Sequence, residues 1–340
     1  MNKKIIILGG GQSGAYAAKE ITTLNPSANV TIITEENNLP YERPPLSKDY
    51  LLGKMNFNQC LFFESDFYIK HNINIITGEK INNFDFEKKT ISSDNNQYVY
   101  DKLLLTTGTK NKILNFKSIN KEINDKILYL RNIEESEIIK NKIKSSSTIG
   151  IIGGGFIGLE IASSACQLGK KVKVIEIGKQ LMGRVIPNDI ANLVQTFHEQ
   201  HGNEFYLNDQ IKEITKEGKQ YKIILSSNHI ISVDTIIVGA GSIPNTSIFS
   251  QTSLKIDNGI ITDQYSQTSE KDVFAAGDVA NFYHPFYGIH MRLESYKHAQ
   301  NHGINAAKNI LNIKTPYEQV PWMWSDQFSL NLQMTGICNN

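Results

Sequence analysis

The sequence has few cysteines and no excess of either charge. Only three of its 340 residues are cysteines, Cys60, Cys166 and Cys338, and no two of them form a C-x-x-C motif. This excludes a disulfide framework, a cysteine-based structural zinc site and a paired-thiol redox centre. The 35 basic and 34 acidic residues give a formal charge of +1, so the composition does not favour nucleic-acid binding.

Long hydrophobic runs are also absent from the sequence. The first apolar run, Ile5–Leu8, ends at a glycine cluster, whereas a secretory signal peptide needs about 7–15 apolar residues. No later stretch approaches the ~18–20 apolar residues of a membrane span. We therefore expect Ile5–Leu8 to be a buried strand in a cytoplasmic protein that does not contact membranes. At about 150 residues per domain, the length predicts two domains.

Two segments of the chain share one pattern. Residues 5–35 and 149–176 each contain a short apolar strand, a glycine cluster, an amphipathic helix and a second strand rich in β-branched residues. Such apolar strands are typical of parallel sheets covered on both faces. A further strand running into a small-residue loop follows each segment, at residues 101–108 and 234–241. The chain is predicted to be α/β, with two Rossmann-like dinucleotide-binding domains.

Shorter stretches between each glycine cluster and its later strand alternate polar and apolar residues. Examples are Ile73–Ile76 in the first copy and Tyr221–Leu225 in the second. Alternation of this kind predicts a small antiparallel sheet in each copy.

Both glycine clusters fit the G-x-G-x-x-G pattern. They consist of Gly9, Gly11 and Gly14 in the first copy and Gly153, Gly155 and Gly158 in the second. The first glycine permits a tight turn, the second lets the backbone approach a pyrophosphate, and the third lets the helix pack on the strand. About 20 residues later come Glu35 and Glu176, each placed to accept hydrogen bonds from ribose hydroxyls. The chain is therefore predicted to bind two dinucleotides.

The last third of the chain differs from the two copies. Residues 268–278 are predicted to form a strand that ends in Gly277-Asp278 and leads into a helical stretch rich in alanine and histidine. Asp278 is placed to accept a hydrogen bond from a ribityl hydroxyl, and the helix N-terminus to face the pyrophosphate. Two dinucleotides in one enzyme usually mean a flavin and a nicotinamide, because hydride passes between them. The predicted cofactors are FAD and NADH.

These motifs resemble a known family. The two fingerprints with Ala275–Asp278 are similar to those of glutathione-reductase-type flavoproteins. Residues 40–48, PYERPPLSK, narrow the resemblance to NADH-dependent ferredoxin reductases of the putidaredoxin and rhodocoxin reductase type. Arg292–Tyr296 and Val320–Gln327 resemble two further flavin-side motifs of that family. The resemblance covers nearly the whole chain.

The resemblance implies which residues hold each cofactor, and it implies no metal site. The FAD residues are Gly9, Gly11, Gln12, Ser13, Gly14, Glu35, Arg43, Lys48, Thr107, Gly108, Gly277, Asp278, Glu294, Ser295, Tyr296 and Trp324. The NAD residues are Gly153, Gly155, Phe156, Ile157, Gly158, Glu176 and Gly241. Because the carboxylate of Glu176 repels a 2′-phosphate, we expect NADH to be preferred over NADPH.

The resemblance also implies the reaction and its catalytic residues. Hydride would pass from NADH to FAD, and single electrons would then leave to a small iron–sulfur protein, a ferredoxin or rubredoxin. Lys48 would stabilise negative charge on the reduced flavin. In the family a matching lysine pairs with a glutamate that follows the second fingerprint, which here is Glu160. The alternatives are an exposed loop cation for Lys48 and an acid on a helix surface for Glu160.

Thiol and metal chemistry are not expected. Residues 41–48 contain no cysteine, unlike the disulfide reductases and single-cysteine oxidases of this fold. Cys60 and Cys166 are expected in the core. The histidines lack metal-ligand spacing and are expected to be solvated or to cap helices; those considered are His198, His201, His284, His290, His298 and His302. Direct one-electron transfer to an external acceptor is therefore favoured.

The expected domains are an FAD-binding domain interrupted by an NADH-binding domain. The former comprises residues 1–112 and 246–320, and the latter residues 113–245. Residues 321–340 are expected to be a truncated remnant of the α+β interface domain found in the resembled family. We expect a monomer or homodimer. The alternative function is an NADH-responsive flavoprotein that acts through partner binding, like apoptosis-inducing factor, or a truncated form with weak acceptor reduction.

Overall fold

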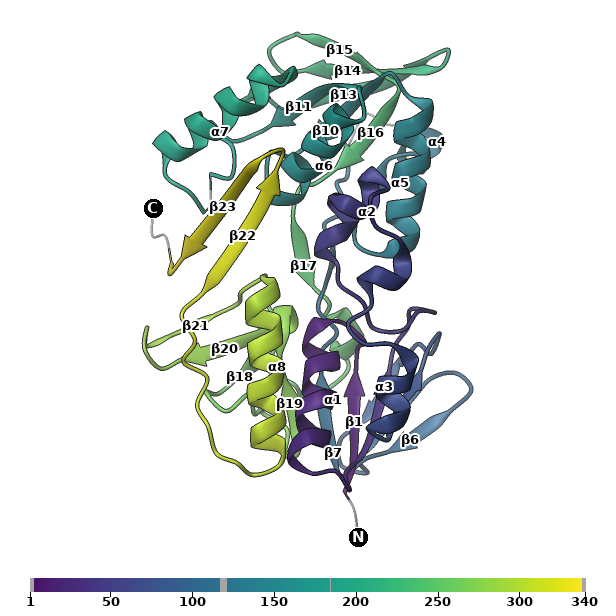
Figure 1. The fold of residues 1–340 in the computed structure, drawn as a ribbon, viewed down its shortest axis with the longest axis vertical. Helices are drawn as coiled ribbons and strands as arrows, with labels where there is room; N and C mark the ends of the chain where they lie inside the picture. The colour runs from purple at the N-terminus through teal and green to yellow at the C-terminus, as the bar shows by residue number, and fades with distance from the viewer. Residues whose placement is uncertain (1–2, 117–120, 184, 338–340) are drawn as a thin grey trace. The chain divides into compact units, whose positions relative to one another are not determined.

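The computed structural model describes residues 3–116, 121–183 and 185–337, which divide into two compact units (Figure 1). Unit 1 consists of Met1–Glu42, Asn58–Lys110 and Ile243–Met323, and unit 2 of Arg43–Phe57, Asn111–Ser242 and Trp324–Asn340. Each unit is built around a parallel sheet with helices, which confirms the predicted α/β class. Cys338, one of the three cysteines, lies outside the described residues.

The main sheet of unit 1 has the strand order β19-β7-β1-β2-β3, and all neighbours are parallel. Its strands are β1 (Lys4–Leu8), β2 (Asn29–Ile33), β3 (Ile73–Ile76), β7 (Lys102–Leu105) and β19 (Val273–Ala275). The prediction that Ile73–Ile76 lies in an antiparallel sheet is therefore wrong. The segment contains a polar residue among apolar ones because β3 lies at the edge of the sheet. Most of its side chains are therefore covered only in part.

Separate cores cover the two faces of this sheet. One core lies between the sheet and the helices α1 (Gln12–Leu24) and α8 (Tyr296–Ile310), which lie side by side in Figure 1. The helices can approach closely because Gly303 has no side chain, and a Cβ there would lie 2.2 Å from the carbonyl oxygen of Ser13. The other core includes Ile91 of β5 (Thr90–Ser92) in the small antiparallel sheet.

The remaining elements of unit 1 are short. They are α3 (Ser65–Lys70), β4 (Asn83–Asp85), β6 (Gln97–Val99), η3 (Ser247–Phe249), β18 (Ile260–Thr262), η4 (Gly277–Val279), β20 (Ala280–His284) and β21 (Ile289–Met291). The prediction of a helix directly after Asp278 is wrong, because η4 leads into the antiparallel hairpin β20–β21 before α8 begins. Gly288, at φ +66°, permits the turn of this aromatic-rich hairpin.

Unit 2 repeats this architecture. Its parallel sheet has the order β12-β11-β10-β16-β9. The strands are β9 (Leu128–Tyr129), β10 (Thr148–Ile152), β11 (Lys171–Glu176), β12 (Asn203–Leu207) and β16 (Thr235–Val238). An antiparallel sheet of β13 (Ile211–Glu217), β14 (Gln220–Leu225) and β15 (Ile230–Val233) packs on one face, which confirms the prediction for Tyr221–Leu225.

Helices and a hairpin complete unit 2. The helical segments are η1 (Pro44–Ser47), α2 (Asp49–Leu52), η2 (Phe57–Cys60, which continues into unit 1), α4 (Lys121–Asn124), α5 (Ile133–Ser145), α6 (Phe156–Gln167) and α7 (Asn188–Gln200). The strands β22 (Trp322–Gln327) and β23 (Leu330–Thr335) form a hairpin, and Leu332 and Met334 pack against the core beside α6 and α7. The chain passes between the units five times: after Glu42, within η2, and within β8 (Thr109–Asn111), β17 (Ser242–Pro244) and β22.

Four histidines are buried, so the expectation of solvated or capping rings is wrong for them. They are His198, His284, His298 and His302. Burial lowers the pKa of His298 to about 3 and that of His198 to about 4, and it also lowers the pKa of His302. The rings of His198, His298 and His302 are therefore neutral at pH 7 and act as polar packing groups.

The two described cysteines differ in burial. Cys60 is buried as predicted, and burial raises the pKa of its thiol to about 11. Cys166 was expected in the core but is only half-buried, because it lies in the last turn of α6. Its Sγ lies 2.8 Å from the carbonyl oxygen of His201.

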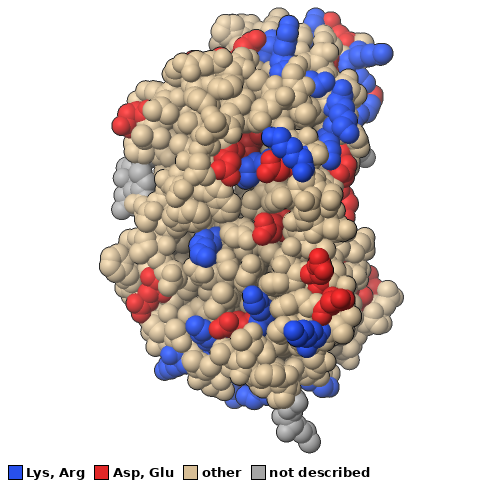
Figure 2. Space-filling view, viewed as in Figure 1, with Lys and Arg blue, Asp and Glu red and all other residues tan. Residues whose placement is uncertain are grey.

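Charged side chains of both signs are interspersed on the face shown in Figure 2. Lys and Arg are most frequent there over the part of unit 2 that carries β13–β15 and α4. Acids lie among them, as in the pairs Lys126–Glu122 at 3.0 Å and Lys222–Glu217 at 2.6 Å. Among the described residues, no helix is long and apolar enough to cross a membrane, and no cluster of ligating side chains suits a metal. The cytoplasmic location stays a prediction.

The ion pairs of Asp272 predict an acid-sensitive contribution to stability in unit 1. Burial alone would raise the pKa of this carboxyl, but Lys102 and Lys89, each 2.6 Å away, lower it from 3.8 to about 2. The shift corresponds to roughly 2 kcal/mol, present above pH 4 and lost as the pH falls towards 2. Asp272→Asn should remove it, as measured by urea unfolding at several pH values.

The conservative change suits this position, because Asn tolerates the backbone of Asp272 at φ +64°. Glu217→Gln is the matched control, since it removes an acid from an ion pair whose side chains are 39% and 61% exposed. Pairs of that kind contribute about 0–1 kcal/mol. Equal stability of the Asp272→Asn protein and the wild type at pH 7 would contradict the prediction.

Candidate active site

The first fingerprint forms a loop between β1 and α1 that is open at one side. Gly9 has φ +117°, and a Cβ there would lie 2.3 Å from the carbonyl oxygen of Thr106. A Cβ on Gly14 would lie 2.1 Å from the carbonyl oxygen of Gly9. By contrast, a Cβ on Gly11 would meet no atom within 4 Å. Gly9 and Gly14 are thus required by the fold, whereas Gly11 leaves space at the N-terminus of α1.

That space suits a phosphate. The backbone amides at the start of α1 have no acceptor within the helix, which makes a helix N-terminus a favourable place for an anion. The Oγ of Ser13 is buried and has no hydrogen-bond partner among the described residues. The loop is held from behind by Thr106, whose hydroxyl donates to the carbonyl oxygens of Leu8 and Gly9 at 3.1 and 3.0 Å. The residues present therefore fit the pyrophosphate of a dinucleotide.

The second fingerprint has the same geometry in unit 2. Gly153 has φ +106°, and a Cβ there would lie 2.6 Å from the carbonyl oxygen of Gly239. A Cβ on Gly158 would lie 2.1 Å from the carbonyl oxygen of Gly153, whereas one on Gly155 would approach nothing closer than 3.9 Å. Phe156 and Ile157 begin α6 beside this open position, and Ile157 is 41% exposed.

The acids that follow the fingerprints differ in their contacts. Glu176 accepts hydrogen bonds from the backbone amides of Gly154 and Gly178, both at 2.6 Å, so it also braces the fingerprint loop. Glu35 makes an ion pair of 3.1 Å with Lys80, and its side chain is 64% exposed. The carboxylate of Glu35 is therefore more exposed to solvent than that of Glu176.

The loops after β7 and β16 carry the other predicted strand-end residues. The hydroxyl of Thr107 donates to the carbonyl oxygen of Asn245 at 3.2 Å, and the amide of Asn245 donates back to Gly108 at 2.9 Å. Gly108 and Gly241 have φ values of +63° and +95°, which favour glycine. These contacts fix the loops at the strand ends where dinucleotides bind in open α/β sheets.

In unit 1, hydrogen bonds connect the predicted residues around the start of α8. Arg292 Nη1 donates to Glu294 Oε1 at 2.6 Å and to the carbonyl oxygen of Asp278 at 3.3 Å. Ser295 caps α8 by accepting from the amide of His298 at 3.2 Å. Arg292 is part of the motif Arg292–Tyr296 that resembles the family, but it is not among the predicted site residues, although its place two residues before Glu294 is a signal that could have identified it.

Two further contacts hold this region. The hydroxyl of Tyr296 donates to Glu42 Oε1 at 2.9 Å. The amide of Gly277 donates to Nδ1 of His302 at 3.2 Å. His302 therefore fixes the Gly277-Asp278 turn, a role that no local sequence pattern indicates.

Lys48 lies in unit 2 between two short helical segments, η1 and α2. Pro44 and Pro45 favour the turn because their ring fixes φ, and the hydroxyl of Ser164 donates to the carbonyl oxygen of Ser47 at 2.7 Å. Gly53, at φ +77°, ends α2. Arg43 precedes η1, and its Nη1 donates to the carbonyl oxygen of Arg131. The segment therefore holds Lys48 in a defined position.

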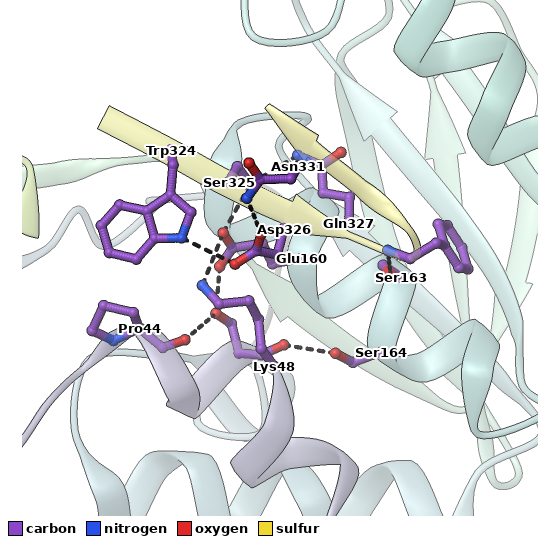
Figure 3. Close-up of polar contacts among 12 residues, drawn as sticks. Pro44, Lys48, Glu160, Ser163, Ser164, Trp324, Ser325, Asp326, Gln327 and Asn331 are labelled. Carbon is purple, nitrogen blue, oxygen red and sulfur yellow. Dashed lines mark hydrogen bonds and ion pairs between the residues drawn. The ribbon is translucent and has the colours of Figure 1, made fainter. Parts of the chain in front are cut away.

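Figure 3 shows the ammonium of Lys48 directed at Glu160. The Nζ–Oε1 distance is 3.2 Å, and the two side chains are only 17% and 7% exposed. Ser325 donates to the same oxygen at 2.8 Å, and Ser47 donates to Oε2 at 2.5 Å. Glu160 lies on the buried face of α6, so neither alternative, an exposed loop cation or a surface acid, describes this pair.

Trp324 lies beside the pair on β22. Lys48 Nζ is 5.8 Å from the centre of its ring, and its Nε1 donates to Asp326 at 3.0 Å. Asn331 on β23 donates to the other oxygen of Asp326 at 2.6 Å (Figure 3). The indole is thus held by its own hairpin and is only half-buried.

Comparison with known proteins agrees with this geometry. A family model described as pyridine nucleotide-disulphide oxidoreductase matches residues 3–303. The chain belongs to this family. It is 34% identical, over 98% of its length and 84% of the relative's, to the ferredoxin–NAD(+) reductase component of the 3-phenylpropionate/cinnamic acid dioxygenase of Photorhabdus laumondii. It is also 34% identical to a rubredoxin–NAD(+) reductase of Ectopseudomonas oleovorans, over 98% of this chain and 86% of that protein.

A solved ferredoxin reductase from Rhodopseudomonas palustris superimposes with a TM-score of 0.93 at 31% identity, over 99% of this chain and 83% of that one. These findings confirm the resemblance to ferredoxin reductases and the predicted fold. Family members of this kind are oxidoreductases, so the predicted flavoprotein class and the cofactors FAD and NADH are confirmed as well. The roles of individual residues and the assignment of residues 1–112 and 246–320 to FAD and 113–245 to NADH stay predictions.

The contrast between Gly11 and Gly14 can be tested. Gly11→Ala should leave the unfolding temperature of the FAD-free protein within about 2 °C of the wild type, because its Cβ meets no protein atom. The same Cβ would fill the space for the pyrophosphate, so FAD affinity should fall at least about tenfold. Fluorescence titration with FAD measures this. Gly14→Ala should instead destabilise the FAD-free protein, and equal effects of the two changes would contradict the assignment.

Glu176 should determine the choice between NADH and NADPH. We expect kcat/KM to favour NADH by about tenfold or more, because the carboxylate attracts a ribose diol and repels a 2′-phosphate. Glu176→Gln removes the charge and keeps one of the two oxygens that accept from the loop amides, so it should lower the preference for NADH. Glu204→Gln, at an exposed acid of neighbouring β12, is the control. Comparable kcat/KM values for both nucleotides in the wild type would refute the assignment.

Proposed function

We propose that this chain takes a hydride from NADH on bound FAD and passes single electrons to a small iron–sulfur protein, a ferredoxin or rubredoxin. The observation that carries the proposal is the buried Lys48–Glu160 pair, set by Pro44 and Pro45 on one side and by α6 on the other. Relatives named as ferredoxin and rubredoxin reductases support the choice of acceptor.

When bound, FAD supplies the redox chemistry, accepting a hydride and releasing electrons singly. The first fingerprint and the Asp278 turn would hold it, and the second fingerprint with Glu176 would hold NADH. Lys48 would stabilise negative charge on the reduced flavin, since a fixed ammonium in a partly desolvated site is more effective than one in water. Glu160 orients that ammonium and balances its charge.

The cysteines support transfer without a thiol relay. Cys60 is buried with a raised pKa, so its thiol is protonated and a poor nucleophile at pH 7. The pKa of Cys166 is also raised by burial. No cysteine lies in the segment 41–48. Electrons would therefore pass from the flavin directly to the external acceptor.

The test is a steady-state assay of the FAD-loaded protein with NADH against a [2Fe–2S] ferredoxin, a rubredoxin and free cytochrome c. We expect cytochrome c reduction to require an added iron–sulfur protein. Slow turnover with every acceptor, together with a long-lived complex formed with NADH, would overturn the proposal and favour the partner-binding alternative.

Lys48→Met tests the catalytic role in the same preparation. Flavin reduction by NADH in stopped flow should slow about tenfold or more, because the ammonium is lost, while FAD stays bound. Lys54→Met changes an exposed lysine of the same segment and should have no effect. An unchanged rate of flavin reduction in the Lys48→Met protein would contradict the catalytic role of Lys48. It would not affect the conclusion about the electron acceptor.

A further inference from the structure

A row of buried polar side chains leads from Glu160 through unit 2 to α7. It consists of Glu160 on α6, Ser325 and Gln327 on β22, His198 on α7 and Asn203 on β12. All five are less than 10% exposed, and Ser325, Gln327 and His198 are fully buried. Buried polar groups are stable when they form hydrogen bonds. The partners of these five side chains can therefore be traced one by one.

The hydrogen bonds are continuous. Ser325 Oγ lies 2.8 Å from Glu160 Oε1, and Gln327 Nε2 lies 3.0 Å from Ser325 Oγ. His198 Nε2 lies 2.9 Å from Gln327 Oε1, and Asn203 Nδ2 lies 2.8 Å from His198 Nδ1. Three intervening groups therefore connect Glu160 to Asn203.

The direction of every link follows from the charge of Glu160. A carboxylate only accepts, so the single hydroxyl proton of Ser325 must point to Glu160. Ser325 must then accept from Gln327, which turns the amide oxygen of Gln327 towards His198. Because burial keeps His198 neutral, its one ring proton must lie on Nε2, and Nδ1 must accept from Asn203.

Only the Glu160 end fixes this direction. Asn203 Oδ1 is buried without a hydrogen-bond partner among the described residues, so the Asn203 amide could present either atom to His198. If Glu160 carried a proton, every link could reverse and His198 would carry its proton on Nδ1. At the Glu160 end, however, Lys48 and Ser47 also donate, at 3.2 and 2.5 Å, and these donors suit a carboxylate.

We propose that Ser325, Gln327 and His198 are positioning residues whose oriented hydrogen-bond chain fixes the Glu160 carboxylate and thereby holds the Lys48 ammonium in place for FAD reduction. The functional part of this inference rests on the proposed role of Lys48. The direction of the chain does not, because it is a property of the protein side chains alone.

Ser325→Ala tests the functional part. It removes a donor to Glu160, so flavin reduction by NADH, measured by stopped flow without any acceptor, should slow about tenfold while FAD stays bound. Ser325→Thr keeps the hydroxyl and should restore most of the rate. Ser163→Ala is the control, because Ser163 accepts from the Phe328 amide of the same hairpin at 2.6 Å but makes no hydrogen bond to the Glu160 side chain. It should leave the rate within about twofold of the wild type.

The position of the ring proton on His198 tests the chain itself. Protein labelled with 15N-histidine would be examined by NMR as the FAD-loaded full chain, with the His198 signals identified by their loss in His198→Gln. We expect a proton on Nε2 alone in the wild type, Ser325→Thr and Ser163→Ala proteins. In Ser325→Ala the ring is disconnected from Glu160, so both tautomers should be populated.

The outcomes separate the two proposals. A single Nε2-protonated form in Ser325→Ala together with an unchanged rate would overturn the chain. Failure to reduce any iron–sulfur protein would overturn the proposed function, yet neither the tautomer nor the acceptor-free rate depends on that step. An equal loss of rate in Ser163→Ala and Ser325→Ala would show that Ser325 only anchors the hairpin, and would also overturn the inference.

Discussion

A buried negative charge on Glu160 is the constraint on which the centre of unit 2 depends. Removing a carboxylate from water costs several kcal/mol unless hydrogen bonds and an opposite charge compensate for it. Here Lys48 and Ser47 come from the segment after Pro44 and Pro45, and Ser325 comes from β22, far along the chain. Two segments must therefore pack against α6 together. The Lys48 segment and the β22–β23 hairpin are held in place by a charge that neither could bury alone.

The same helix serves two purposes. The N-terminus of α6 follows the second fingerprint, where Gly155 leaves space for a phosphate, and its buried face carries Glu160 one turn further on. Any shift of α6 relative to β10 would disturb both. The close approach of Gly158 to Gly153 limits such a shift, because it fixes the helix against the strand. The glycine pattern that suits a dinucleotide thus also determines where Glu160 lies.

The two nucleotide-binding units share a backbone but differ in what covers it. In unit 1, α8 packs on α1 at Gly303, and His302 on the same helix fixes the turn at Gly277. In unit 2, the helix that corresponds to α1 is α6, and its buried face carries Glu160. The acids differ as well, since Glu176 braces its loop whereas Glu35 is largely exposed. The two units therefore share a backbone arrangement but place different side chains beside their fingerprint loops.

The local geometry of the two fingerprints follows from the spacing of their glycines. Positive φ at Gly9 and Gly153 and the close contacts of Gly14 and Gly158 leave no room for other residues, so these positions could be identified from spacing alone. The pairing of Lys48 with Glu160 came from a resemblance rather than from periodicity. Short alternating segments were less informative, because Ile73–Ile76 has the same pattern at the edge of a parallel sheet as in an antiparallel one.

The burial of polar residues and their contacts depend on how distant elements pack together. His198 has no local signature, and the motif that contains Ser325 and Gln327 does not show what they contact. The hydrogen bonds His198–Gln327 and Ser325–Glu160 span 129 and 165 residues of the chain. Burial depends on packing between α6, α7 and β22, which no window of sequence contains. The energy of a buried hydrogen bond depends on its partners, so the oriented chain to Glu160 exists only once these elements have come together.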